Sequence, residues 1–187
     1  MRSTAPQHFE FQPARRVFLR VASAAAVSLI PLGAAWARTV ERRTLSFVHT
    51  HTGERLSAVY FRGGQYQSGE LERINRLLRD FRTGDVHPID PEVLDILADL
   101  RVLADRDEPY EVISGYRSPK TNAALRSHSS GVAEHSLHIQ GRAIDVRLPG
   151  VATRRLRELA AAMRRGGVGF YLRSDFVHLD NGRVRYW

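Results

Sequence analysis

The pattern of hydrophobic and polar positions after residue 43 predicts short strands interspersed with helices. Two β-prone runs, at 44–49 and 55–61, flank a turn-forming segment at 51–54, an arrangement typical of a β-hairpin. Shorter strand-like runs follow at 110–113, 143–148, 168–171 and 176–179. The last two close the chain about a turn at 173–174 and predict a second hairpin.

Apolar residues at helical spacing predict helices between these strands. The predicted helices lie at 68–81, 91–103, 119–126 and 153–165. Ser68, Asp90 and Thr153 are expected N-caps, because short polar side chains satisfy free backbone N–H groups at a helix start. A polar, histidine-rich loop is expected at 127–140. Because strands and helices do not alternate strictly, this order indicates an α+β fold and not a doubly wound sheet.

The length of 187 residues indicates one globular domain. Hydrophobic residues make up 43% and charged residues 26% of the chain, which excludes a disordered or multi-span membrane protein. The chain has no cysteine, so a disulfide scaffold, a thiolate zinc site and a cysteine nucleophile are excluded. Any metal must therefore be bound by His, Asp or Glu.

The formal net charge is +8, and of the 28 basic residues only Lys120 is a lysine. The basic residues are scattered along the chain and interleaved with 20 acidic ones, whereas nucleic-acid-binding proteins gather them in a patch or stripe. We therefore expect no nucleic-acid partner. The same charge attracts anionic polymers such as cell wall or a membrane surface.

Residues 1–37 have the features of an export signal. Paired arginines at 15–16 precede an alanine-rich apolar run, and Ala-Trp-Ala at 35–37 fits a cleavage site. The pair resembles the twin-arginine signal that exports folded proteins in bacteria. An uncleaved anchor is the alternative, but about 15 apolar residues fall short of the about 20 that span a bilayer. We expect a single mature domain at 38–187, in the periplasm and without stable membrane insertion.

The carboxyl half carries residues in a metal-binding pattern. His138 is followed by a glycine-bearing turn and then, on an expected strand, by Asp145, while His178 lies further along. Two histidines and one carboxylate form a set of three protein ligands that leaves a fourth tetrahedral position for water, as catalytic zinc requires. Asp175, three positions before His178, is the spare carboxylate that takes a proton from such a water. The spacing predicts one zinc ion per chain, bound by His138, Asp145 and His178.

The segment 136–145 has the pattern Ser-x-His-x-x-Gly-x-Ala-x-Asp. This pattern resembles the zinc signature of metallopeptidases that cut D-alanyl-D-alanine and peptidoglycan cross-bridges. Within that group the chain is most similar to the murein endopeptidase K branch, through 114–119, 167–169 and 174–178. The resemblance covers roughly residues 44–187. It implies a Hedgehog/DD-peptidase-like α+β domain with a small antiparallel sheet flanked by helices.

The resemblance also implies roles for the site residues. It assigns the zinc to the three ligands that the spacing predicts, and it makes Asp175 the general base. Arg117 would hold the scissile carbonyl or the developing oxyanion, which a guanidinium in a water-poor cleft stabilises. Many relatives that hydrolyse cross-bridges carry His-x-His at 176–178, whereas this chain has Phe176. The group that protonates the leaving amine therefore stays open.

Other polar residues near these motifs have weaker expected roles. His135 is expected to line the cleft without binding metal, because sharing a face with the neighbouring ligand requires a helix. His49 and His51, two apart on the first hairpin, are expected to be solvent-exposed. Asp180 is a candidate outer-shell partner of the last zinc ligand, since metal-bound imidazoles usually donate their second nitrogen to a carboxylate or carbonyl.

Several functions are compatible with these features. The favoured one is a monomeric zinc peptidase that hydrolyses peptide cross-links in peptidoglycan by attack of a zinc-activated water. The resemblance implies L,D or D,D links involving meso-diaminopimelate. The alternative enzyme is a D,D-carboxypeptidase or dipeptidase acting on terminal D-alanyl-D-alanine. The presence of Asp175 and Arg117 disfavours a non-catalytic, zinc-stabilised peptidoglycan-binding module, and the lack of a histidine-rich tract disfavours a metal-delivery protein.

Overall fold

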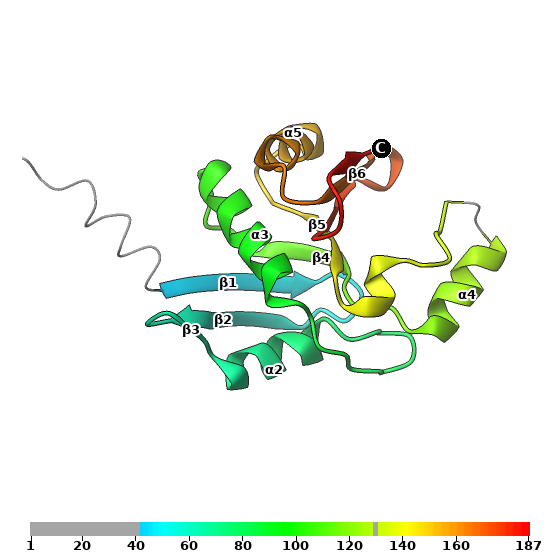
Figure 1. Cartoon of the computed structure of the whole chain (residues 1–187), viewed down its shortest axis with the longest axis horizontal. Helices are drawn as coiled ribbons and strands as arrows, with labels where there is room; N and C mark the ends of the chain where they lie inside the picture. Colours follow the sequence, from blue (N-terminus) through cyan, green and yellow to red (C-terminus); the bar gives the residue numbers. More distant parts are fainter. Residues whose placement is uncertain (1–41, 129–130) are drawn as a thin grey trace, which may run out of the picture. The chain divides into compact units, whose positions relative to one another are not determined.

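The computed structural model describes residues 42–128 and 131–187, which build one β-sheet with helices packed on it (Figure 1). Its eight strands run in the order β3-β2-β1-β4-β5-β7-β6-β8. In chain order they are β1 (Arg42–His49), β2 (Arg55–Arg62), β3 (Gln65–Tyr66), β4 (Tyr110–Ser114), β5 (Ala143–Arg147), β6 (Gly167–Tyr171), β7 (Phe176–Asp180) and β8 (Arg185–Tyr186). Both predicted hairpin strand pairs are confirmed.

The described helices accompany this sheet. They are α2 (Ser68–Leu77), α3 (Pro91–Leu103), α4 (Pro119–His128) and α5 (Thr153–Met163), with 3₁₀ turns η1 (Leu137–Gln140) and η2 (Leu172–Ser174). Helix α2 packs against β2, α3 against β1, and α5 against β6 and β7. The predicted α+β class is confirmed. Of the helices described, none is both long and apolar enough to cross a membrane.

The sheet is mixed and larger than the small antiparallel sheet that the resemblance implied. Strands β1 and β4 are parallel, as are β6 and β8, and the other neighbours are antiparallel. Two parallel strands need a long connection that returns the chain to the same end of the sheet. Between β1 and β4 this connection contains β2, β3, α2 and α3, so the first hairpin and the later strands of the described chain join into one sheet.

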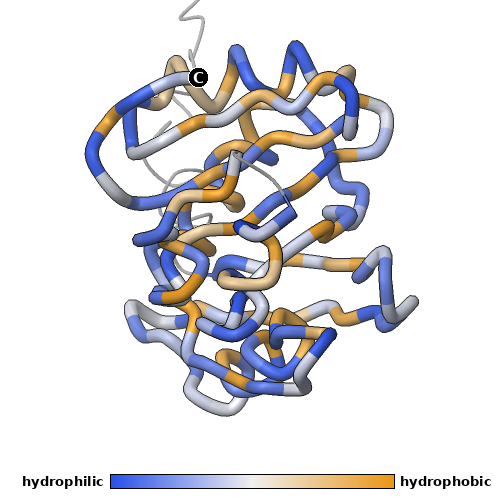
Figure 2. Tube along the Cα trace, turned by 90° about the vertical axis from the view of Figure 1, so that its right-hand side faces the viewer, coloured by the Kyte–Doolittle hydropathy of each residue, from blue (hydrophilic) through white to orange (hydrophobic). Residues whose placement is uncertain are grey.

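Alternation of side chains places the core. Leu45 and Phe47 of β1 and Ala58 and Tyr60 of β2 are at most 1% exposed, and the positions between them are only partly buried. Hydrophobic and hydrophilic stretches follow one another at short intervals along the trace (Figure 2). Burying a large apolar side chain contributes about 1.5–3 kcal/mol, so this hairpin is anchored to the body of the domain.

His49 continues the buried face of β1, and the prediction that it is solvent-exposed is wrong. Its ring packs edge-on against Phe81, with 5.5 Å between centroids. Its Nδ1 accepts the backbone N–H of His51, and burial lowers the pKa of His49. His51 is exposed as predicted, although its ring stacks on Phe81. His49 is buried because it lies two residues after Phe47 on the strand, and alternate residues of a strand face the same side.

Helix α2 differs from its prediction at both ends. Gln67 is the N-cap in place of Ser68, and it forms no side-chain cap hydrogen bond. The helix ends at Leu77, earlier than predicted. The carbonyl of Leu78 accepts the backbone N–H of Tyr116, so a tertiary contact takes the place of another helical turn.

Helix α5 starts where the pattern predicts but without the predicted cap. Ala152 is the N-cap residue and offers no side-chain acceptor, while the hydroxyl of Thr153 donates to Asp175 instead. The helix ends at Met163, before Arg164 in a left-handed conformation. By contrast, Asp90 caps α3 as predicted, through the backbone N–H of Glu92. The predicted export signal at 1–37 lies outside the described residues.

Candidate metal centre

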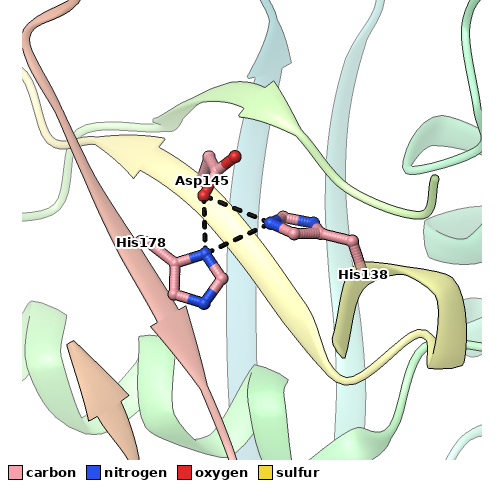
Figure 3. A group of neighbouring side chains, drawn as sticks. All are labelled: His138, Asp145 and His178. Carbon is pink, nitrogen blue, oxygen red and sulfur yellow. Dashed lines mark hydrogen bonds and ion pairs between the residues drawn. The ribbon is translucent and has the colours of Figure 1, made fainter. Parts of the chain in front are cut away.

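Three side chains that lie up to 40 positions apart in the sequence meet on one face of the sheet. His138 comes from η1, Asp145 from β5 and His178 from β7, and all three point toward one another (Figure 3). Strands β5 and β7 are antiparallel neighbours in which Asp145 lies opposite His178. The strand register alone therefore brings two of the three residues together.

The three ligand atoms are close and shielded from solvent. His138 Nε2 lies 3.2 Å from His178 Nδ1 and 3.3 Å from Asp145 Oδ1. His178 Nδ1 lies 2.9 Å from Asp145 Oδ1. All three residues are at most 8% exposed. Electrostatic interactions in such a buried cluster are stronger than in water.

Gly141 turns the chain from η1 into β5. Its φ is 66°, in the left-handed region, and a Cβ at this position would lie 2.0 Å from the carbonyl oxygen of Pro88. Only glycine fits this combination of backbone conformation and close approach. The turn lets His138, just before it, and Asp145, on the strand after it, face the same point.

The second nitrogen of His138 fixes the orientation of its ring. Nδ1 lies 2.7 Å from the carbonyl oxygen of Gly115. A carbonyl only accepts, so Nδ1–H donates and Nε2 is left as an acceptor that faces the cluster. Burial lowers the pKa of His138, which favours the neutral imidazole that a metal ligand must be.

His178 is oriented from the other side by Asp180. Its Nε2 lies 2.9 Å from Asp180 Oδ2, so the prediction that Asp180 partners this histidine is confirmed. Arg185 donates to both carboxylate oxygens of Asp180, at 3.0 and 2.7 Å. These bonds hold Asp180 as a charged acceptor for Nε2–H and leave Nδ1 of His178 facing Asp145.

The pKa values of the cluster show that it attracts positive charge. Burial lowers the pKa of His178, but hydrogen bonds to Asp145 and Asp180 outweigh burial and raise it to about 9. Burial also works against the charged form of Asp145, yet the two histidines hold the pKa of Asp145 well below its usual range. Without a metal ion the cluster therefore binds a proton, which a metal ion displaces on binding.

The donor set and its spacing fit zinc. Two imidazole nitrogens and one carboxylate oxygen are suitable zinc ligands, and three protein ligands leave a fourth position open. Zinc bonds of about 2.0–2.1 Å in a tetrahedron separate the ligand atoms by about 3.3 Å. The three observed separations, 2.9 to 3.3 Å, are close to this value. The residues present therefore suit a catalytic zinc ion with little rearrangement.

Arg117 lies beside the cluster, as the resemblance implied. Its Nη2 is 3.7 Å from Asp145 Oδ2, and its side chain is only 13% exposed. Burial lowers the pKa of Arg117, but a guanidinium stays charged at neutral pH. A cavity of about 410 Å³ is lined by Arg117 and by the three cluster residues. A substrate group in this cavity can thus contact both the cluster and a buried positive charge.

The cavity has a polar wall and an aromatic wall. The segment 131–136, apart from Glu134, forms one wall, which we call the polar wall after its side chains His135 and Ser136. The prediction that His135 lines the cleft is confirmed. The aromatic wall consists of Tyr171, Phe176 and Trp187. Tyr171 and Phe176 stack with 4.6 Å between ring centroids, and Trp187 Nε1 donates to the Tyr171 hydroxyl at 3.1 Å. Sequence analysis missed Tyr171 and Trp187, because neither belongs to a spacing pattern.

Asp175 does not line this cavity. It follows η2 in a left-handed conformation, with a φ of 51°. Its carboxylate accepts the hydroxyl of Thr153 and lies 3.6 Å from Arg147 Nη1, and its side chain is 60% exposed. The structure therefore brings the three predicted zinc ligands and Arg117 together and leaves the predicted general base outside.

Comparison with known proteins places the chain in a family. A family model described as peptidoglycan L,D-endopeptidase MepK matches residues 37–187. The chain belongs to the MepK family. Peptidoglycan L,D-endopeptidase MepK of Escherichia coli K12 is 40% identical over 180 residues, which cover 95% of this chain and 99% of the relative. The probable peptidoglycan L,D-endopeptidase MepK of Haemophilus influenzae is 40% identical over 163 residues, or 86% and 88% of the two chains.

Membership of the MepK family confirms the resemblance read from the sequence and the predicted peptidase class. The identity extends over nearly the full length of the Escherichia coli relative. No solved structure matches the chain.

Proposed function

We propose that this protein is a zinc-dependent endopeptidase that hydrolyses L,D peptide cross-links of peptidoglycan, in particular links involving meso-diaminopimelate. The convergence of ligand atoms from His138, Asp145 and His178 in a cavity that Arg117 also lines carries the proposal. One relative is named as a peptidoglycan L,D-endopeptidase and another as a probable one. Their names favour this activity over a D,D-carboxypeptidase or dipeptidase acting on terminal D-alanyl-D-alanine.

His138, Asp145 and His178 would hold one zinc ion. When bound, zinc supplies water with a pKa near neutrality and a Lewis acid for the scissile carbonyl. Gly115 and Asp180 accept the remaining imidazole protons, so both rings already present the nitrogen that a metal ion needs.

Arg117 supplies the positive charge for the reacting carbonyl. When the carbon of the scissile carbonyl becomes tetrahedral, its oxygen gains negative charge. A preorganised hydrogen-bond donor in a water-poor site stabilises that charge by about 3–4 kcal/mol. The buried position of Arg117 beside Asp145 suits this role. The aromatic wall lines the same cavity and offers it an apolar surface.

Asp175 is our candidate for the general base. It would take the proton of the attacking water and pass it to the leaving amine. Thr153 and Arg147 hold its carboxylate outside the cavity, so this role requires the side chain to leave Thr153 and turn toward the substrate. The support for Asp175 is its position three residues before His178, where the resembling peptidases carry their base.

We further propose that residues 1–37 direct export by the twin-arginine route and that the domain 38–187 acts in the periplasm as a monomer. The match to the family model starts at residue 37, in agreement with a boundary at this point. The net positive charge also suits an anionic polymer as substrate.

Incubation of the zinc-loaded protein with purified muropeptide dimers of L,D or D,D linkage tests the proposal. Products are separated by chromatography and identified by mass spectrometry, and zinc content is measured on the same samples. We expect monomers from the L,D-linked dimer, loss of hydrolysis after chelation, and recovery when zinc is restored. Stoichiometric zinc with every dimer left intact would instead identify a binding module.

Asp175→Ala tests the base in the same assay. We expect zinc to be retained and turnover to fall by about 10²–10⁴-fold, the usual contribution of a general base. Asp105→Ala is the matched control, because Asp105 is also an exposed aspartate with a φ of 51° and lies outside the cavity. Full activity of Asp175→Ala removes Asp175 from the mechanism and leaves the zinc proposal in place.

A further inference from the structure

Asn122 is a buried amide on helix α4, next to a wall of the cavity. It lies in the first turns of α4, its backbone N–H donates to the carbonyl of Ser118, and it is only 3% exposed. A buried side-chain amide is costly unless its donors and its acceptor are all used. The partners of Asn122 therefore show why a polar residue stands here.

The amide nitrogen of Asn122 binds the polar wall of the cavity. Nδ2 donates to the backbone carbonyls of Ala133 and Glu134, at 3.2 and 3.3 Å. Both carbonyls belong to the segment that lines the cavity or directly adjoin it. Two acceptors at one end of the amide fix which end carries the nitrogen. The oxygen must then point the other way.

The amide oxygen of Asn122 binds the guanidinium of Arg117. Arg117 Nη1 donates to Asn122 Oδ1 at 3.4 Å. Among the described residues, Nε of Arg117 has no hydrogen-bond partner, and the guanidinium forms its ion pair with Asp145, at 3.7 Å from Nη2. Asn122 thus supplies a hydrogen bond that holds the guanidinium on the side away from the metal ligand.

A neutral amide suits this task better than a carboxylate. A carboxylate at position 122 would pair with Arg117 and reduce the charge available to a substrate oxyanion. An amide oxygen accepts a hydrogen bond and leaves the full positive charge in place. Without any partner at 122, the guanidinium is free to move toward Asp145, the nearest negative charge.

We propose that Asn122 is a positioning residue that sets Arg117 and the polar wall of the cavity in one arrangement. This inference rests on the proposed function, in which Arg117 stabilises the oxyanion. The inference gives Asn122 an effect on turnover through Arg117. Among the described residues, the side-chain hydrogen bonds of Asn122 go to Arg117 and to the polar wall, and not to the three cluster residues.

A double-mutant cycle tests the coupling, with the L,D-linked muropeptide dimer as substrate. We expect Asn122→Ala to lower kcat by about tenfold or more with a smaller change in KM, because the lost interaction acts in the transition state. In an Arg117→Ala background the same substitution should change kcat by less than about twofold. An equal loss in both backgrounds, or no loss with Arg117 present, overturns the proposal.

Arg126→Ala is the matched control for the wall. Arg126 also ties α4 to this segment, through Glu134 at 3.2 Å, but it lies on the surface and does not contact Arg117. We expect kcat within about twofold of the parent protein. A loss as large as that of Asn122→Ala would show that tethering of the wall, and not placement of Arg117, accounts for the effect.

A spectroscopic readout separates this inference from the proposed function. In protein labelled with ¹⁵N-arginine, the Arg117 side-chain signals are identified by their absence from Arg117→Lys. We expect Asn122→Ala and Asn122→Asp to shift these signals and Arg126→Ala to leave them unchanged. If the parent protein cleaves no dimer, the proposed function fails while the spectra still test the contact. Unchanged Arg117 signals in both Asn122 variants overturn the proposal.

Discussion

Two carboxylates in this protein each gather several partners, but the partners are of opposite kinds. Asp95 on α3 accepts hydrogen bonds from the hydroxyls of Tyr60 and Tyr66, at 2.8 and 2.7 Å, and from Arg43 at 2.9 Å. Each contact pairs a donor with an acceptor, and Arg43 balances the charge. This cluster joins β1, β2 and β3 to α3 and is complete as it stands.

Asp145 instead faces the second nitrogen of each of two imidazole rings. One N–H group of His138 and one of His178 point away from it, to Gly115 and Asp180. With both rings neutral, three acceptor atoms would face one another, so a cation must lie among them: either the proton that His178 holds with its raised pKa or a metal ion. Burial and charge alone do not distinguish the two clusters, whereas the direction of each proton does. Convergent donors complete a structural cluster, and convergent acceptors create a binding site.

Replacing Asp145 is expected to have the largest effect. Asp145→Asn removes the negative ligand, and we expect loss of stoichiometric zinc together with a fall in muropeptide hydrolysis of about 10³-fold or more. Metal analysis after dialysis and the dimer assay measure the two effects. Asp95→Asn is the control and should retain zinc and activity. Equal zinc content in both variants would contradict the distinction between the clusters.

Asp180→Asn weakens the orientation of a ligand without removing it. Because Asp180 holds Nε2–H of His178, we expect zinc affinity to fall by about 10–100-fold. Competition with a chromophoric chelator measures this affinity, and circular dichroism checks that the fold is kept. An unchanged affinity would mean that strand register alone orients His178.

Asp80 is a third carboxylate, and like Asp95 it is surrounded by hydrogen-bond donors. We expect its replacement to change the stability of the fold. Its oxygens accept the backbone N–H groups of Arg82 and Ser118. Burial works against its charged form, but hydrogen bonds from Thr121 and Ser118 outweigh burial and lower the pKa of Asp80 to about 2 from 3.8. The charged carboxylate therefore stabilises the fold above the unfolded-state pKa, and this stabilisation is lost as the pH falls toward about 2.

We accordingly expect Asp80→Asn to cost about 2 kcal/mol near pH 7, from the pKa shift. Urea unfolding of both proteins at several pH values measures the difference in free energy of unfolding, which should shrink below about pH 4. A difference that stays constant with pH would show that Asp80 acts through packing and not through its charge.

The smallest effect is expected from removing one donor to Asp95. Tyr60→Phe removes one of three donors and leaves the other two, so we expect a loss of about 1 kcal/mol in the free energy of unfolding. Zinc content and hydrolysis should not change. A loss of activity in this variant would connect the structural cluster to the site and contradict their separation.

Local patterns predicted much of the fold. Helix α3, with Asp90 as its cap and Pro91 at its first position, has the predicted bounds, because caps and apolar spacing act within a few residues. The first hairpin and the terminal strands were likewise predictable. The parallel pairing of β1 with β4 was not, since strand order depends on packing between distant segments.

The sequence by itself determined which chemistry this protein can carry. The spacing of His138, Gly141 and Asp145 already specifies two ligands about a left-handed turn, and the absence of cysteine limits the donors. Only the tertiary structure decided which proton points where. Gly115 and Asn122 come from other parts of the chain, and Asp175 lies against Thr153 instead of in the cavity. Hydrogen-bond partners are chosen by proximity in space, which local sequence patterns do not contain.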